Sequence, residues 1–226
     1  LTFIPHYLFF KIIGDFYWQI IENNFHNEQF INLTESLFQA AFVEESLKYL
    51  VFLFLIARFN AFNEPMDAIV YGVCISLGFS LMETLEWSHI NFNNYGEAMA
   101  LENAQVRSYS SNILHAGCGV TMGYILSRAF FQKKNSFLKL SLALLIPILI
   151  HGFYNFSILT GAWVLTIIFL IICALLVLFG WKKSRARQKL KKMELEDKVV
   201  TFSVFNVLGA VIICFFLVVL LINFIK

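Results

Sequence analysis

The chain has 226 residues, of which 59% are hydrophobic and 14% are charged, and its formal net charge is only +2. A soluble domain carries about 45–50% apolar and about 25% charged residues. The mean hydropathy of +0.71 comes from several apolar runs long enough to span a bilayer, which takes about 18 residues or more. These values exclude a soluble enzyme, a secreted disulfide scaffold and a nucleic-acid-binding module, and they predict a polytopic membrane protein.

The N-terminal region, residues 1–34, differs from the rest of the chain. Apolar side chains recur at helical spacing over residues 1–23, and polar residues such as Lys11 and Asp15 fill the other face. This pattern predicts an amphipathic helix lying in the membrane interface, or a short spanning helix. A polar extracytoplasmic linker follows, up to residue 34.

Six spanning helices are predicted near residues 35–58, 66–88, 107–131, 137–159, 160–181 and 200–225. The expected fold class is all-α, a polytopic membrane helical bundle of about six spanning helices plus the N-terminal helix. Its catalytic core is the four-helix part over residues 35–159, and residues 160–226 hold two further spans joined by a basic loop. Gly119 and Gly123 form a small-xxx-small pair, which predicts close packing against another helix.

Basic residues concentrate in alternate connections. Arg58 ends the first span, Arg128 to Lys139 surround the third connection, and residues 182–198 carry eight basic and three acidic side chains. Loops rich in Lys and Arg stay on the cytoplasmic side. We therefore predict a multi-pass protein of the cell membrane with cytoplasmic basic loops and an acidic, Asn-rich loop over residues 90–105 on the other side.

Polar residues occur inside four of these spans, although one ionisable group at mid-bilayer costs about 2.5–3.5 kcal/mol. At a rise of about 1.5 Å per residue, they lie roughly 8–14 Å below the outer ends of their helices. Because neighbouring helices run in opposite directions, this shared depth predicts one polar cavity. The candidate site residues are Glu44, Glu45, Lys48, Glu83, His115, His151 and Asn155.

Spacing within the helices adds detail. Glu44 and Lys48 are four residues apart, which favours an ion pair. Glu45 projects about 100° away from Glu44, so the two carboxylates are not expected to point at one atom. His151 and Asn155 share a helical face, so Asn155 can orient the imidazole or donate hydrogen bonds itself.

Two kinds of hydrolysis fit such a cavity. In one, a Glu acts as general base on a water while His and Asn stabilise the oxyanion. In the other, zinc is bound by residues from the set Glu45, Glu83, His115 and His151 and holds the water. The motif H-E-x-x-H of soluble zinc proteases does not occur in the chain, and the residue spacing is compatible with both routes.

Five segments resemble one known family when they are taken together and in order. They are VEESLKYLVF at 43–52, NEPMDAIVYG at 63–72, GFSLMET at 78–84, His115 with GYILSR downstream, and IHGFYN at 150–155. This part of the chain, about residues 35–158, resembles the PrsW family of intramembrane proteases, within the CAAX prenyl protease and bacteriocin-immunity superfamily. The resemblance implies a membrane-embedded peptidase that cleaves an anti-sigma-factor-like membrane protein on its extracytoplasmic side.

The family's motifs fall on particular residues of this chain. The double-Glu motif falls on Glu44 and Glu45 with Lys48, the Phe-x-x-x-Glu motif on Phe79 and Glu83, and the histidine motifs on His115 and on His151 with Asn155. The chain departs from the family in two places. Thr84 stands where Asn is frequent, and Asn155 stands where Asp is often found.

The sequence thus predicts an intramembrane peptidase that acts in the lipid bilayer on a membrane protein substrate, expected to be single-pass, and that has no nucleic-acid partner. Glu44 or Glu45 is the expected base, and Glu83 and His115 complete the water or metal site. His151 with Asn155 would bind the oxyanion or metal. Two alternatives remain open: a proton-coupled transporter or channel that uses the same carboxylates, and a non-catalytic immunity or binding protein of the same superfamily.

Overall fold

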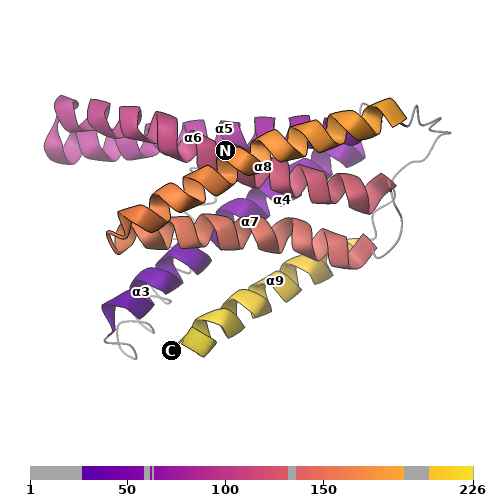
Figure 1. Cartoon of the computed structure of the whole chain (residues 1–226). Coiled ribbons are helices and arrows are strands. Elements are labelled where there is room, and N and C mark those ends of the chain that lie inside the picture. The colour runs from indigo at the N-terminus through magenta and orange to yellow at the C-terminus, as the bar shows by residue number, and fades with distance from the viewer. Residues whose placement is uncertain (1–26, 59–61, 63, 132–135, 191–203, 226) are drawn as a thin grey trace.

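A computed structural model describes residues 27–58, 62, 64–131, 136–190 and 204–225 (Figure 1). Every regular element within these residues is a helix, so the all-α fold class is confirmed. The predicted N-terminal helix over residues 1–23 and residues 191–198 of the predicted basic loop lie outside the described residues. The elements are α3 (Glu28–Thr34), η2 (Glu35–Phe42), α4 (Val43–Arg58), α5 (Pro65–Tyr95), α6 (Glu97–Phe131), α7 (Ser136–Leu159), α8 (Trp163–Leu190) and α9 (Val204–Ile225). Residues 182–190, predicted as loop, instead continue the helix α8.

The first predicted span belongs to one continuous helix made of α3, η2 and α4. It begins after Asn27, whose side chain accepts a hydrogen bond from the backbone N–H of Gln29 at 3.0 Å. Its middle section, η2, is a π-helix, and the residues at both ends of η2 keep right-handed helical dihedral angles. π-helical turns are rare and frequently lie at functional sites. Here the π-helix ends directly before the polar residues of α4.

α5 and α6 form a long antiparallel hairpin. The prediction of a loop over residues 90–105 is wrong, because these residues belong to the two helices and to the turn between them. α5 continues to Tyr95, the chain turns at Gly96 with a φ of 87°, and α6 begins at Glu97. Glycine adopts this positive φ without a steric penalty. The polar residues stay helical because several bond back to their own helix, as when the Asn91 side chain donates to the Trp87 carbonyl at 2.8 Å.

The inner part of this hairpin is packed without side chains between the two backbones. A Cβ atom at Gly119 would collide with the carbonyl oxygen of Gly72, and one at Gly123 would collide with that of Ala68. The predicted close packing of Gly119 and Gly123 is therefore confirmed, and its partner is α5. This contact fixes the register in which the outer, polar parts of α5 and α6 face one another.

α6 lies at the centre of the bundle, in contact with α5, α7 and α8, and α7 also packs against η2 and α9. The main core between these helices is apolar and includes Leu37, Phe52, Met122, Leu144 and Ile148. α5, residues 137–159 of α7 and residues 163–183 of α8 are each long and apolar enough to cross a membrane. The chain is therefore a helical membrane protein.

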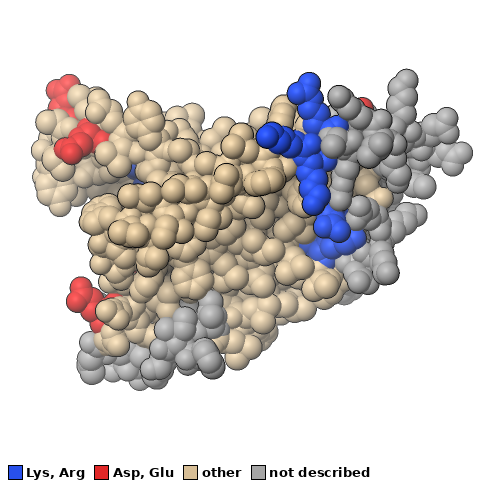
Figure 2. Space-filling model, in the orientation of Figure 1, with Lys and Arg blue, Asp and Glu red and all other residues tan. Residues whose placement is uncertain are grey.

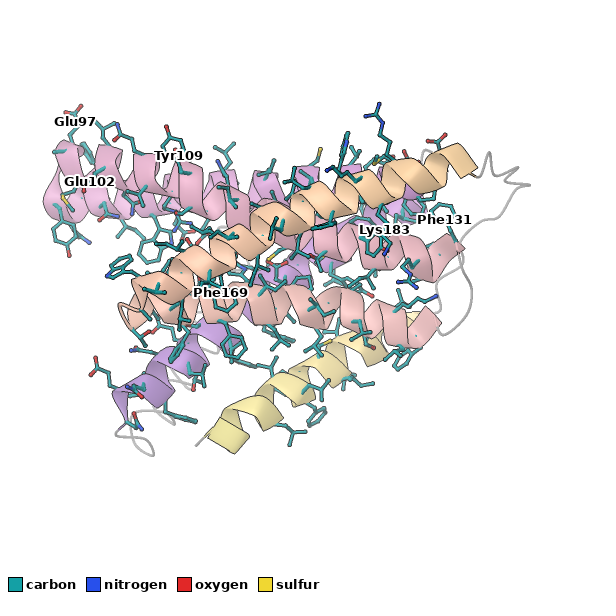
Figure 3. The ribbon with its side chains drawn as sticks, in the orientation of Figure 1. Glu97, Glu102, Tyr109, Phe131, Phe169 and Lys183 are labelled. Carbon is teal, nitrogen blue, oxygen red and sulfur yellow. The ribbon has the colours of Figure 1, made fainter. Side chains whose placement is uncertain are left out.

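The two ends of the bundle differ in charge. On the face shown in Figure 2 most of the Lys and Arg side chains gather at one end of the molecule, while most of the Asp and Glu side chains lie at the other. Figure 3 places Lys183 toward the first of these ends, and Glu97 and Glu102 at the opposite tip of the α5–α6 hairpin.

Candidate active site

Two adjacent carboxylates of α4 share one lysine. The Lys48 Nζ atom lies 2.7 Å from Glu45 Oε1 and 3.4 Å from Glu44 Oε2. The expectation that these carboxylates would not point at one atom is wrong. Lys48 follows Glu45 by three residues and Glu44 by four, so its side chain lies between the two carboxylates. Lys48 and Glu45 are fully buried, whereas Glu44 keeps 8% of its surface exposed.

The network extends from α4 to both histidines. Lys48 Nζ lies 2.8 Å from His115 Nδ1 on α6, and Glu45 Oε1 lies 2.9 Å from His151 Nδ1 on α7. A lysine ammonium only donates, so His115 Nδ1 accepts and its proton belongs on Nε2. The two imidazole rings lie 5.0 Å apart between centroids, at 72° to one another.

Glu83 on α5 completes the connection between four helices. Its Oε2 atom accepts from His115 Nε2 at 3.0 Å. Six of the seven predicted site residues therefore form one continuous network of hydrogen bonds and ion pairs. Their chemical roles stay predictions.

Asn155 lies apart from this network. It is half-buried on α7, one turn after His151, and among the described residues we find no hydrogen bond from it to the other site residues. α7 itself continues as one helix through Pro147.

Arg107 is a site residue that the sequence analysis missed. Its Nη2 atom lies 2.8 Å from Glu83 Oε2 and donates to Ser111 Oγ at 3.2 Å. The sequence predicts a loop over residues 90–105, so Arg107 falls at the boundary of the next predicted span. The residue spacing could have indicated that Arg107 belongs to the site. Arg107, Ser111 and His115 recur every fourth residue and therefore lie on one face of the helix.

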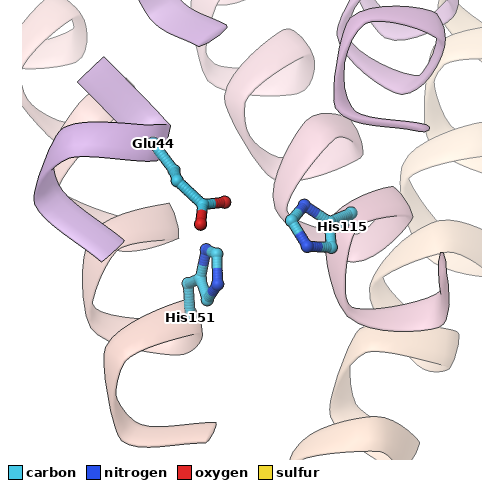
Figure 4. A group of neighbouring side chains, drawn as sticks. All are labelled: Glu44, His115 and His151. Atoms are coloured by element: carbon cyan, nitrogen blue, oxygen red, sulfur yellow. The ribbon is translucent and has the colours of Figure 1, made fainter. Parts of the chain in front are cut away.

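Three residues bring potential metal ligands together. Glu44, His115 and His151 each offer one ligand atom, and these atoms lie within 4.8 Å of one another (Figure 4). Two imidazoles and a carboxylate are the protein ligands of many catalytic zinc sites. This group contains Glu44, whereas the carboxylates that the sequence predicts as possible metal ligands are Glu45 and Glu83.

Glu45 and Glu83 instead contact the histidines from behind this group. A histidine that binds a metal usually donates its other ring N–H to a carboxylate, which fixes the orientation of the ring. Glu45 holds Nδ1 of His151 in this way and leaves its Nε2 available. Both nitrogens of His115 are engaged, so His115 can bind a metal through Nδ1 only if Lys48 turns away.

One carboxylate oxygen in the site lacks a protein partner. Glu45 Oε2 is buried and makes no hydrogen bond to any described residue. Buried polar atoms are nearly always hydrogen-bonded to protein or ordered water. The site thus contains an acceptor suited to a water molecule or to a donor group of a ligand.

Comparison with known proteins gives a consistent result. Residues 2–181 match the family described as PrsW family intramembrane metalloprotease. The chain is 35% identical over 157 residues to a protein named Protease PrsW from Oceanobacillus iheyensis, covering 66% of this chain and 67% of that protein. No solved structure matches.

Two further relatives carry the same name, Protease PrsW. The Bacillus subtilis protein is 35% identical over 122 residues, covering 54% of this chain and 52% of that protein. The Clostridioides difficile protein is 32% identical over 140 residues, covering 59% of this chain and 56% of that protein. The matched part thus spans between half and two thirds of the length of these relatives.

Proposed function

The chain belongs to the PrsW family of intramembrane metalloproteases, and we propose that it hydrolyses a peptide bond of a membrane protein near the extracytoplasmic surface. The observation that carries this proposal is the buried network that joins Glu44, Glu45 and Lys48 to both histidines. Carboxylates, imidazoles and an ammonium group are energetically costly to place inside a membrane protein, so residues of this kind usually mark a functional site. The expected substrate is single-pass and anti-sigma-factor-like, as the family resemblance implies.

The proposed topology places the site in the outer half of the membrane. Six helices span the bilayer with the Lys- and Arg-rich end of the bundle in the cytoplasm, according to the positive-inside rule. The separation of basic and acidic side chains between the two ends supports this orientation. His115 then lies about eighteen residues, or roughly 27 Å, from the outer end of the long helix α6. It lies closer than this to the outer end of α8, because Gly117 packs against Cys173, only ten residues after α8 begins.

On a route without metal, Glu44 is the general base. Its carboxylate has the weaker contact with Lys48, 3.4 Å against 2.7 Å for Glu45, and it retains some exposure. Glu44 would take a proton from water as the water oxygen attacks the peptide carbonyl, and would return a proton to the leaving amine. Glu45 stays paired with Lys48 and His151 and keeps the ring in place.

On a metal route, Glu44, His115 and His151 would be the ligands, and His115 would bind through Nδ1 once Lys48 turns away from it. A bound divalent ion such as zinc supplies Lewis-acid activation of water and of the scissile carbonyl. Glu45 and Glu83 then hold the rings of His151 and His115, respectively. Lys48 neutralises the neighbouring carboxylates.

Asn155 remains the proposed oxyanion donor. Its amide lies one turn beyond His151 and is not committed to the network, so it can turn toward a bound substrate. Removing one oxyanion donor typically lowers kcat about 100- to 1000-fold.

Cleavage of a single-pass membrane protein in proteoliposomes tests the proposal. We expect Glu44→Gln and His151→Ala to lower kcat by at least about 100-fold, the scale of a lost general base. Glu28→Gln is the control, because Glu28 is an exposed carboxylate on α3 outside the site. Turnover that stays unchanged in both site variants would reject the proposed chemistry.

A further inference from the structure

The α5–α6 hairpin continues beyond the rest of the bundle. α5 has 31 residues and α6 has 35, or about 46 and 52 Å of helix, whereas the hydrocarbon core is only about 30 Å thick. Gly117 of α6 packs against Cys173 of α8. α8 begins ten residues before this contact and α6 begins twenty residues before it. About 15 Å of α6 therefore extends past the start of α8. Figures 1 and 3 show the α5–α6 hairpin projecting beyond the start of α8.

We call residues 86–106 the hairpin tip. Its large apolar side chains point outward: Phe92 is 54% exposed, Tyr95 70% and Leu101 57%. Small and polar side chains lie between its two helices, where Ala100 is buried and Asn103 Oδ1 is buried without a partner among the described residues. A projecting apolar surface of this kind marks an interaction site.

Contact with lipid explains the exposed apolar side chains at the base of the hairpin tip, near Trp87, but not those at its far end, near Tyr95. Counted from Pro65, about 30 Å of α5 reaches residue 85, and the headgroup layer adds only about 5–8 Å. Trp87 and Tyr109 lie at that level and suit the aromatic belt of a membrane interface. Tyr95 lies about 15 Å past residue 85, beyond the headgroups, so a protein partner is the better occupant.

The charge of the hairpin tip defines that partner. It carries Glu86, Glu97 and Glu102 and contains no Lys or Arg. Acidic side chains are repelled by anionic lipid headgroups and attract a basic polypeptide, for which complementary charge raises the association rate. Exposed aromatic and aliphatic side chains between the carboxylates supply apolar contacts.

The hairpin tip is also directly connected to the site. Glu83 lies one turn below it on α5, and Arg107 follows it directly on α6. A polypeptide held at the tip therefore has its next residues beside the Glu83–Arg107 pair. The tip is in a position to present a substrate to the network.

We propose that the hairpin tip docks the basic, apolar-rich segment of the substrate that lies just outside the membrane. This proposal rests on the proposed function, because it assumes that the tip and the site face the same side. It assigns to the tip the selection of substrates by charge, separately from bond cleavage in the site.

Peptide binding to the full chain in phosphatidylcholine nanodiscs tests this proposal. The probes are two labelled 20-residue peptides, one alternating Lys with Leu and Phe, the other carrying Glu in place of Lys. We expect the basic peptide to bind at least fivefold more tightly. The double variant Glu97→Gln/Glu102→Gln should weaken its binding about five- to tenfold, or about 1.0–1.4 kcal/mol, because two exposed charge pairs are lost.

Matched variants distinguish charge from contact. Glu28→Gln removes an exposed carboxylate on α3, which begins at the same end of the bundle (Figure 1), and should leave binding unchanged. Tyr95→Ser/Leu101→Ser should weaken binding of the basic peptide, whereas Leu159→Ser, an exposed residue at the end of α7, should not. Equal binding of both peptides, or equal losses in the control variants, would overturn the proposal.

Two further outcomes are distinguishable. If Tyr95→Ser/Leu101→Ser lowers only the attachment of the tip to phosphatidylcholine vesicles and leaves peptide binding unchanged, the tip is a lipid anchor and the docking proposal is wrong. Binding is also measured in a Glu44→Gln background, where cleavage is not needed. Peptide binding that persists there supports docking even if wild-type protein shows no proteolysis, in which case only the proposed function fails.

Discussion

Arg107 and His115 contact the same oxygen atom, Oε2 of Glu83, at 2.8 and 3.0 Å. The guanidinium therefore reaches the histidine of the site through a single carboxylate. Arg107 is the cationic residue nearest the outer end of α6, and it is 19% exposed in its side chain. Because the contacts found for it among the described residues are with Glu83 and Ser111 and not with the carboxylates of α4 or His151, we propose that it acts on the site as a positioning residue.

Replacing Arg107 should therefore reduce activity without removing the network. We expect Arg107→Met to lower kcat about 10- to 100-fold, as is typical when a residue that orients a ligand is lost. Arg107→Lys should recover part of this loss, because the lysine keeps the charge but not the planar hydrogen-bonding geometry. Steady-state cleavage of a single-pass substrate measures both, with Arg185→Met at the other end of the bundle as control. Equal activity of Arg107→Met and wild type would show that Glu83 needs no such support.

The packing of α5 against α6 predicts a contrast between two glycines. Gly119→Ala should destabilise the protein by about 1–3 kcal/mol, the cost of overpacking, because its Cβ would meet the backbone of Gly72. Gly78→Ala is the matched control, since a Cβ there meets nothing within 4 Å, and alanine is favoured over glycine in a helix by about 0.5–1 kcal/mol. Thermal unfolding in detergent compares the two. A Tm of Gly119→Ala equal to that of Gly78→Ala would contradict the observed helix contact.

The shared lysine predicts non-additive stability effects. Lys48→Met removes the ammonium between two buried carboxylates and should cost about 3–5 kcal/mol, as for other broken buried ion pairs. Adding Glu45→Gln removes one of the uncompensated charges, so the double variant should be more stable than Lys48→Met alone. Chemical unfolding of the two single variants and the double variant gives the coupling free energy. Additive losses would mean that Lys48 and Glu45 do not interact in solution.

Metal content separates the ligands from the residues that orient them. If Glu44, His115 and His151 bind a metal, alanine at either histidine should abolish stoichiometric metal in the purified protein. Glu83→Gln should retain most of the metal at an affinity lowered about 10- to 100-fold. Elemental analysis and competition with a chelator measure this directly. Stoichiometric metal in His151→Ala would exclude the proposed ligand set.

The sequence predicted the helical core well because each helix inside the membrane carries a long apolar run. The predicted spans near 35–58 and 137–159 correspond to helices that end within a residue or two of the expected positions. The hairpin tip was missed, because it lies beyond the membrane by our placement and has no apolar run to reveal it. Only Gly96 marks the turn.

The site was predictable as a set of residues but not as a network. The common depth of the polar residues indicated that they would meet. Which carboxylate faces which histidine depends on side-chain distances across α4, α6 and α7, and these follow from the packing of whole helices. This is why Glu45, expected to bind metal, contacts His151 from behind, while a carboxylate oxygen of Glu44 lies within 4.8 Å of a ring nitrogen of each imidazole.

The π-helical section before the site has a consequence for relatives of this chain. A π-helix turns through a smaller angle per residue than an α-helix, so η2 sets the rotation of Glu44 and Glu45 about the helix axis relative to α3. Loss of one residue from η2 would restore ordinary α-helical winding and swing both carboxylates away from the imidazoles. A homologue with such a deletion could keep every motif of the family in its sequence and still lack an assembled catalytic centre.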